Sequence, residues 1–315
     1  MSTDLVNSPA QALDRPSPQR VEELLGAFIA NHDAKQSSKA LYRRVLRQYF
    51  NWVNKKGYLL SQIAREHILE YKDELLGSGI SSLTVAAYLT AVKVFYTWAE
   101  ASKFYPNVAR GVKLPKREQK YQRRPLSLEQ SKALVSYCKT IAPRDAALIN
   151  LLHRTGLRLI EAARSNIGDI DQLEGKRILW VQGKGRDAKD KYVVLTDKAY
   201  LPLAQYLKTR KKTKKDEPLF VSVSNNSLGR RLSTREISHI AKAGLQAIGI
   251  DSRAYTAHSL RHTTAVSILR AGGRLEDAQG VLRHSNSATT QGYLKIFEEE
   301  MRLKNAPEEL LDSLY

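Results

Sequence analysis

The sequence predicts a mainly α-helical protein with one small antiparallel β-sheet, divided into an N-terminal helical bundle and a larger, mostly helical second domain. Apolar residues recur about every 3.6 residues through most of the 315-residue chain, which is typical of amphipathic helices. Two short stretches, 176–182 and 191–197, instead hold β-branched residues with a period of two. Residues 112–124 are strongly basic and have no apolar period, so they are predicted to link the two domains.

The first half is expected to be a small helical domain. Residues 1–18 are polar, contain three prolines, and are predicted to be a disordered tail. The domain itself spans 19–111, and its helices are expected at 21–32, 38–57, 65–79 and 82–103. The aromatic residues of these helices, such as Tyr49 and Phe95, follow the apolar stripe, so we expect them in the core. Gly57 suits the end of the second helix because glycine adopts the left-handed conformation without strain.

The second domain is expected to span 125–293. Ser127, with Gln130 three residues later, has the pattern of a capping box and predicts where its first helix begins. The two strands follow as a hairpin joined by the polar segment 183–190. The expected helices are 127–141, 142–156, 157–171, 198–212, 233–249, 257–273 and 275–285.

The composition indicates a polyanionic partner. The net charge is +19, concentrated in the linker and the second half, and 42% of residues are apolar. Cys138 is the only cysteine, which excludes an intrachain disulfide and a cysteine-rich zinc site. The first residues lack the apolar core of a signal peptide, and no long apolar run follows. We therefore expect a cytoplasmic, nucleoid-associated protein without a membrane partner.

Basic residues that could contact DNA fall in two groups. One group lies on the outer faces of the second and fourth helices, and the other lies in the linker. A solvated charged face is the simpler interpretation of the first group, and a flexible tether is the simpler interpretation of the second. The candidate DNA-binding residues are Arg43, Arg44, Arg47, Lys93, Lys113, Lys116, Arg123 and Arg124.

A second, scattered set of side chains is suited to phosphate chemistry. Arg158 and Glu161 stand at the start of a predicted helix, and His258 and Arg261 share one helix face at i and i+3. His258 and His262 have the spacing of a zinc helix, but no intervening glutamate or nearby third ligand accompanies them, so no metal is expected. The complete set is Arg158, Glu161, Lys184, His258, Arg261, His284 and Tyr293.

These motifs, in this order and spacing, resemble the tyrosine recombinases, the family of phage integrases and Xer-type strand-exchange enzymes. The matching stretches are "TGLRLIE", "GKG", "HSLRH" and "LRHSNSATTQGY". The resemblance covers about residues 19–310 and implies that 19–111 is a SAM-like core-binding domain for DNA. It also implies that 125–293 is the catalytic domain.

The resemblance further implies a role for each residue. Tyr293 would attack a DNA phosphate and form a 3′-phosphotyrosine, with no cofactor, metal or ATP. Arg158, Arg261 and His284 would bind the non-bridging oxygens, and Lys184 would protonate the departing 5′ oxygen. His258 would either accept the tyrosine proton or hydrogen-bond the phosphate. Glu161 would support the geometry from behind the site.

Several alternatives stay open at this point. Lys189 and Lys191 lie on the same hairpin and rival Lys184. Arg283 stands where relatives often have glycine. Gly292 precedes Tyr293 where a bulkier residue is common, and it would loosen the helix of the nucleophile by about 1 kcal/mol relative to alanine. A non-catalytic DNA-binding regulator and a type IB topoisomerase are the alternative functions.

The expected partners are double-stranded DNA with paired half-sites and further copies of the chain. The resemblance implies a dimer on one site and a tetramer in synapsis, with a mobile element as the expected setting and an accessory or partner recombinase as a further expected partner. Residues 294–315 form an acidic tail with apolar residues at Leu294, Phe297, Met301, Leu310, Leu311 and Leu314. This tail either docks on a neighbouring subunit or folds on its own domain.

Overall fold

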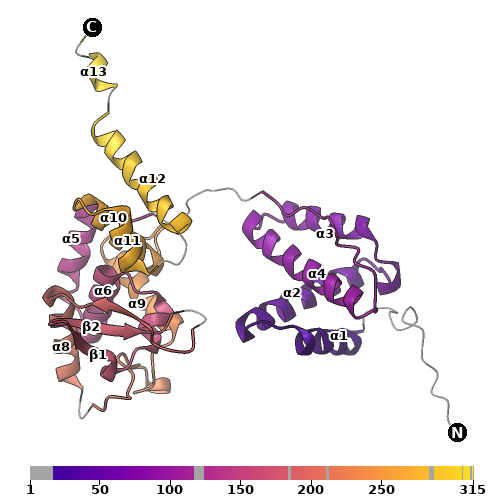
Figure 1. Cartoon of the computed structure of the whole chain (residues 1–315), viewed down its shortest axis with the longest axis horizontal. Helices are drawn as coiled ribbons and strands as arrows, with labels where there is room; N and C mark the ends of the chain where they lie inside the picture. The colour runs from indigo at the N-terminus through magenta and orange to yellow at the C-terminus, as the bar shows by residue number, and fades with distance from the viewer. Residues whose placement is uncertain are drawn as a thin grey trace. The chain divides into compact units, whose positions relative to one another are not determined.

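The computed structural model describes residues 17–116, 124–183, 186–210, 213–283, 287–306, 308–312 and 314, and the side chains of 287–290 lie outside this description. The chain divides into two compact units, Met1–Lys120 and Tyr121–Tyr315 (Figure 1). Each unit has its own hydrophobic core. The mainly helical fold with one small antiparallel sheet is confirmed.

The first unit is a bundle of helices around an aromatic core. Its helices are α1 (Pro18–Asn31), α2 (Gln36–Lys55), α3 (Arg65–Gly77) and α4 (Ser82–Ala101), with a 3₁₀ turn at Leu60–Gln62. Phe28, Tyr49 and Phe95 are buried in this core, and burying one such ring contributes about 1.5–3 kcal/mol. Gly57 follows Lys56, the C-cap of α2, and has a φ of 74°, so it lies one residue beyond the cap position that the sequence suggested for it.

The second unit combines its helices with a three-stranded sheet. The strands β1 (Ile170–Leu173), β2 (Lys176–Val181) and β3 (Lys191–Val194) are antiparallel in the order β1-β2-β3. Leu179 lies opposite Val193 in the sheet, and both side chains enter the core. The helices are α5 (Leu128–Tyr137), α6 (Pro143–Thr155), α7 (Leu159–Arg164), α8 (Asp197–Thr209), α9 (Thr234–Ala247), α10 (Ala257–Arg270), α11 (Leu275–Leu282), α12 (Ser287–Lys304) and α13 (Glu309–Asp312).

The expected single helix over 157–171 was wrong. α7 ends at Arg164, a 3₁₀ turn covers Ile167–Asp169, and β1 begins at Ile170. Backbone groups of this stretch bond to a distant segment instead of continuing the helix. The carbonyl of Ser165 accepts from the N–H of Leu219 at 2.9 Å. Serine, asparagine and glycine have low helix propensity, so these tertiary bonds override a weak local preference.

Helix α10 is the central element of the second unit. It packs against α6, α9, α11 and α12, and its residues from Ser259 to Val266 are all buried. A helix that is buried on all sides must pair any polar side chain it carries with protein groups. This surrounding determines how Arg261, on the same helix, is held.

Candidate active site

The first arginine of the predicted set is placed by the junction between α6 and α7. α6 ends at Thr155, and Gly156 follows in the left-handed conformation with a φ of 59°. A Cβ at this position would lie 2.5 Å from Leu282 Cδ2 and 3.3 Å from the side chain of Thr264. Only glycine tolerates both this φ and this close approach. The resulting turn brings Arg158 to the position immediately before α7.

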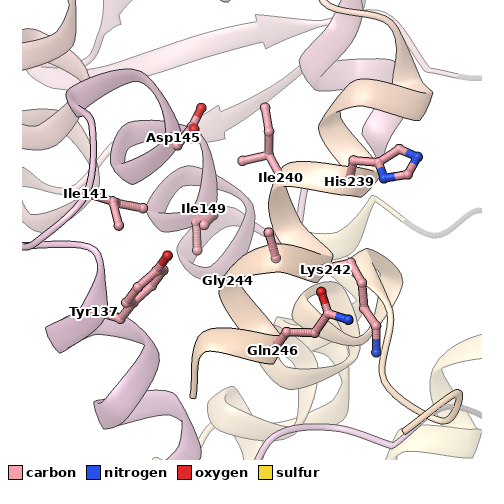
Figure 2. Close-up of a pocket in the computed structure, with 10 residues that line it drawn as sticks. Tyr137, Ile141, Asp145, Ile149, His239, Ile240, Lys242, Gly244 and Gln246 are labelled. Atoms are coloured by element: carbon pink, nitrogen blue, oxygen red, sulfur yellow. The ribbon is translucent and has the colours of Figure 1, made fainter. Parts of the chain in front are cut away.

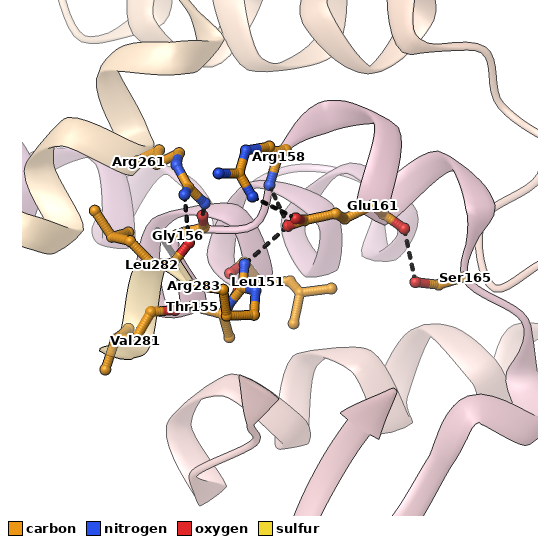
Figure 3. Close-up of polar contacts among 10 residues, drawn as sticks. All are labelled: Leu151, Thr155, Gly156, Arg158, Glu161, Ser165, Arg261, Val281, Leu282 and Arg283. Carbon is orange, nitrogen blue, oxygen red and sulfur yellow. Dashed lines mark hydrogen bonds and ion pairs between the residues drawn. The ribbon is translucent and has the colours of Figure 1, made fainter. Parts of the chain in front are cut away.

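Arg158 is fixed by a carboxylate of its own helix. Its backbone N–H donates to Glu161 Oε2 at 2.8 Å, and its Nη1 donates to Oε1 of the same carboxylate at 2.8 Å (Figure 3). The Glu161 side chain is 1% exposed, whereas the Arg158 side chain is 31% exposed. The arginine is therefore oriented from its buried side while part of it stays accessible to a ligand.

Arg261 is one of the largest fully buried side chains in the described part of the chain. Its Nη1 donates to the carbonyl of Gly156, and its Nη2 donates to the carbonyl of Leu282 (Figure 3). These bonds join α10 to the α6–α7 junction and to the end of α11. Burial, and then the charges of Arg158 and Arg283, lower the pKa of Arg261 to about 9. An anion bound beside this group would stabilise its charged form.

A third guanidinium belongs to the same cluster, and the sequence did not predict it. Arg283 follows α11 in the left-handed conformation, with a φ of 55°, which costs a residue other than glycine about 1–2 kcal/mol. Its Nη2 donates to Glu161 Oε2 at 2.8 Å, and the two side chains are 6% and 1% exposed. In the sequence, Arg283 was noted only as a departure from glycine, because no local pattern predicts a partner so distant in the chain.

Glu161 therefore lies between two guanidinium groups. Burial by itself would raise the pKa of Glu161, but the charge of Arg283 and then the hydrogen bonds of Arg158 lower it below its ordinary value. Together, Arg158, Arg261 and Arg283 carry three positive charges against one carboxylate. An excess of positive charge in buried surroundings suits a phosphodiester, and it suits still better a transition state on which more negative charge develops.

Tyr293 lies on α12 and is 2% exposed. Its ring meets His262 edge-on, with ring centroids 4.9 Å apart, and His262 in turn contacts His258 at 5.0 Å. Arg261 interacts electrostatically with Tyr293. The structure thus brings Arg158, Arg261, His258 and Tyr293 into one region of the second unit. The apolar residues of the cluster that holds the tyrosine are Ala265, Val266, Ala278 and Leu282.

Comparison with known proteins identifies the family that has this arrangement. The model of the phage integrase family matches residues 124–300, and the model of the phage integrase N-terminal SAM-like domain matches residues 11–103. The chain belongs to the phage integrase family. It is a tyrosine recombinase, an enzyme that transfers DNA strands in site-specific recombination.

Curated relatives of this recombinase include Xer proteins. Tyrosine recombinase XerC of Thermodesulfovibrio yellowstonii is 29% identical over 269 residues, covering 81% of this chain and 84% of the relative. Tyrosine recombinase XerD of Rickettsia bellii is 26% identical over 289 residues, covering 88% of this chain and 93% of the relative. The similarity extends along most of both chains, so it includes both units.

Solved structures share the fold of this recombinase. The XerH site-specific recombinase bound to palindromic difH substrate, a post-cleavage complex, has a TM-score of 0.72 and 20% identity over 93% of this chain and 85% of that chain. A lambda integrase dimer bound to a COC′ core site has a TM-score of 0.66 and 14% identity over 85% of this chain and 96% of that chain. At these identities the likeness concerns the fold alone.

Two residues of the predicted set, Lys184 and His284, lie outside the described residues. The rival lysines of the hairpin are described. Lys189 Nζ pairs with Asp169 at 2.6 Å, and Lys191 begins β3 at the surface of the recombinase. The carbonyl of Gly183, at the end of the described part of the hairpin before Lys184, accepts from Arg164 Nη1 at 3.2 Å. This bond ties the approach to Lys184 to the same helix that begins after Arg158.

The predicted DNA-binding residues of the first unit have different surroundings. Arg44 and Arg47 are exposed and line a groove of about 800 Å³, and Arg47 also pairs with Glu22. Arg43 is half-buried. Lys93 is half-buried too, and its Nζ donates to the carbonyl of Val112 at 2.7 Å, so it holds the end of this unit. In the predicted linker, Lys113, Lys116 and Arg124 are exposed, and Arg123 lies outside the described residues.

A pocket of about 390 Å³ lies between α5, α6 and α9 of the recombinase (Figure 2). Its lining includes Tyr137, His239 and Lys242, and it contains none of the predicted catalytic residues. Within the described ranges, no helix is both long and apolar enough to cross a lipid bilayer. Among the same residues, no group of three His, Cys, Asp or Glu side chains is arranged to hold a metal ion.

Proposed function

We propose that this tyrosine recombinase cleaves DNA with Tyr293 as its nucleophile, in a phosphate site built from Arg158, Lys184, His258, Arg261 and His284. The proximity of two guanidinium groups carries this proposal: the charge of Arg158 lowers the pKa of Arg261, and the buried carboxylate of Glu161 orients Arg158. Two guanidinium groups supply planar, permanently charged donors for the non-bridging oxygens of a phosphate, a task that lysine performs less well.

The proposed reaction is a phosphoryl transfer in which the nucleophile loses one proton and the leaving group gains one. The Tyr293 phenol oxygen forms a bond to phosphorus, and its proton passes to His258 or to solvent. The bond from phosphorus to the 5′ oxygen breaks, and Lys184 donates a proton to that oxygen. The product is a 3′-phosphotyrosine and a free 5′ hydroxyl. The phosphotyrosine ester retains the energy of the phosphodiester that was cleaved. Attack by the 5′ hydroxyl of a second strand therefore rejoins the DNA without ATP, metal or cofactor.

Tyr293 must leave its apolar surroundings for this step. The residue is 2% exposed in a cluster with residues of α10 and α11. A DNA phosphate is much larger than the space that such burial leaves, so the first turns of α12 shift when the substrate binds. The buried tyrosine is then an inactive arrangement that protects the nucleophile between reactions.

The assembly and location follow from the same function. We propose a dimer on each DNA site with paired half-sites and a tetramer in synapsis, aided by an accessory or partner recombinase. The DNA belongs to the nucleoid of the cytoplasm or to a mobile element. The exposed arginines of α2 and the exposed lysines of the predicted linker, Lys113 and Lys116, would follow the phosphate backbone.

The tail supports this assembly in part. Helix α12 is held by its own unit as far as Glu300, since Arg270 Nη2 pairs with Glu300 at 2.7 Å. Beyond that ion pair, Leu303, Leu310 and Leu314 are 67%, 69% and 72% exposed. We propose that the residues after Glu300 dock on a second copy of the chain, because several large exposed apolar side chains in one segment are typical of an interaction surface.

A covalent-complex assay tests the catalytic assignment. Nicked duplexes that carry candidate sites from the genomic surroundings trap the cleaved intermediate, which denaturing electrophoresis detects as a protein–DNA band. The wild type forms this band and Tyr293→Phe does not, although it binds the same DNA. Tyr192→Phe, an exposed tyrosine of β3, is the matched control. A band that persists in Tyr293→Phe would refute the assignment, and a wild type that binds without any band would favour the non-catalytic regulator.

A further inference from the structure

Arg283 forms the most buried ion pair among the described residues of the second unit, yet it lies outside the predicted catalytic set. Its guanidinium is 6% exposed, and its partner Glu161 is 1% exposed. Its Nη1 also donates to the carbonyl of Val281 at 2.6 Å, and its Nε has no hydrogen-bond partner among the described residues. Burying a guanidinium with an unpaired donor is costly, so the position must be stabilised by the interaction with Glu161.

The backbone at Arg283 adds a second cost. The residue has a φ of 55°, where glycine is favoured. A glycine here would relieve the strain and remove the buried charge together. The chain nevertheless carries an arginine here, and its side chain reaches Glu161 from a distant part of the sequence, which indicates that the contact has a function.

That use follows from the geometry around the carboxylate. Glu161 Oε2 accepts from Arg283 Nη2 at 2.8 Å and from the backbone N–H of Arg158 at 2.8 Å, while Oε1 accepts from Arg158 Nη1. Arg283 therefore binds the same carboxylate oxygen as the backbone N–H of Arg158 (Figure 3). Without Arg283, the carboxylate of Glu161 would keep hydrogen bonds only from Arg158 among the described residues. Arg158 is the residue that Glu161 orients.

We propose that Arg283 is a positioning residue for strand cleavage, which acts by holding Glu161 against the start of α7 and so fixes the guanidinium of Arg158 for the phosphate. This inference rests on the proposed function. It also explains how the site keeps its positive charge: Glu161 is shared by two arginines, so it does not neutralise Arg158 fully. Arg158 thus retains attraction for the substrate.

Three variants of the full chain test the inference in single-turnover cleavage of a nicked duplex. Arg283→Gly should slow formation of the covalent complex by about 100-fold, the scale expected for a misplaced catalytic group, while DNA affinity changes by about twofold or less. Arg283→Lys keeps the charge and should recover part of the rate. Arg274→Gly removes the same side chain from the exposed start of α11 and should cleave like the wild type.

Two further readouts separate positioning from a structural role. The effect of Arg283→Gly on the cleavage rate should nearly vanish in a Glu161→Gln background, because both substitutions break the same series of contacts from Arg283 through Glu161 to Arg158. The acid limb of the cleavage rate should also move to higher pH in Arg283→Gly, since loss of the positive charge raises the pKa of Glu161. Additive effects of the two substitutions, or an unchanged cleavage rate in Arg283→Gly, would overturn the inference.

The controls distinguish this failure from failure of the proposed function. A wild type that forms no covalent complex refutes the proposed function. A wild type that cleaves together with an Arg283→Gly variant that cleaves equally well refutes only the role of Arg283. A rate loss in Arg283→Gly that matches a loss of folded protein, measured by thermal unfolding, also counts against positioning.

Discussion

Gly156→Ala should destabilise the second unit more than the substitution of a glycine that has the same backbone strain but no close neighbours. Gly156 has a φ of 59°, which costs alanine about 1–2 kcal/mol. The new Cβ would also lie 2.5 Å from Leu282 Cδ2 and 3.3 Å from Thr264 Cβ. Relief of such a clash in a packed core costs about 1–3 kcal/mol more. We therefore expect a total loss of about 2–5 kcal/mol.

Gly249→Ala is the matched control for the backbone term. Gly249 has a φ of 80°, and a Cβ there would meet nothing within 4 Å. Its substitution should cost only the strain of about 1–2 kcal/mol. The difference between the two variants thus isolates the contact of Gly156 with α10 and α11.

Hydrogen exchange in the full chain measures this difference, because it reports the opening free energy of α10 amides separately from the first unit. Gly156→Ala should also slow DNA cleavage, since the carbonyl of Gly156 accepts from Arg261. Equal opening free energies for the two variants would refute the packing argument. A Gly156→Ala variant that cleaves at the wild-type rate would refute the link between this turn and Arg261.

Three other predictions concern α12, the tail and a buried histidine. Gly292→Ala should slow cleavage of a nicked substrate if Gly292 lets Tyr293 swing into the site, and equal rates would end that idea. Deletion of 302–315 should spare binding of the first subunit but reduce cooperativity in a gel-shift titration, and unchanged cooperativity would contradict docking. Burial and then the charge of Arg154 lower the pKa of His153 to about 4. The free energy of unfolding should therefore be largest above pH 6.5 and decrease as the pH falls towards 4. The reason is that His153 takes up its proton at a higher pH in the unfolded state than in the folded state. His153→Leu should flatten this pH dependence in urea titrations, and an unchanged slope would show that another group is responsible.

Local patterns predicted most helices because their information is short-range. The capping pattern of Ser127 and Gln130 is confirmed by two hydrogen bonds, of 2.9 and 3.1 Å. The same reasoning failed over 157–171, where the backbone of Ser165 and Ile167 pairs with the distant segment 217–219. A spacing rule cannot include bonds to residues that are remote in the chain.

The candidate site also contains contacts that local spacing predicts and contacts that only packing decides. The sequence by itself indicated the family, the order of the candidate residues and the position of Arg158 and Glu161 three residues apart at a helix start, where i,i+3 neighbours lie close in space. Only the tertiary structure decided that Arg283 shares that carboxylate and that Tyr293 is buried against His262. Both contacts depend on how α10, α11 and α12 pack. Packing brings together charged groups and rings that are far apart in the sequence, and no regular spacing predicts such pairs.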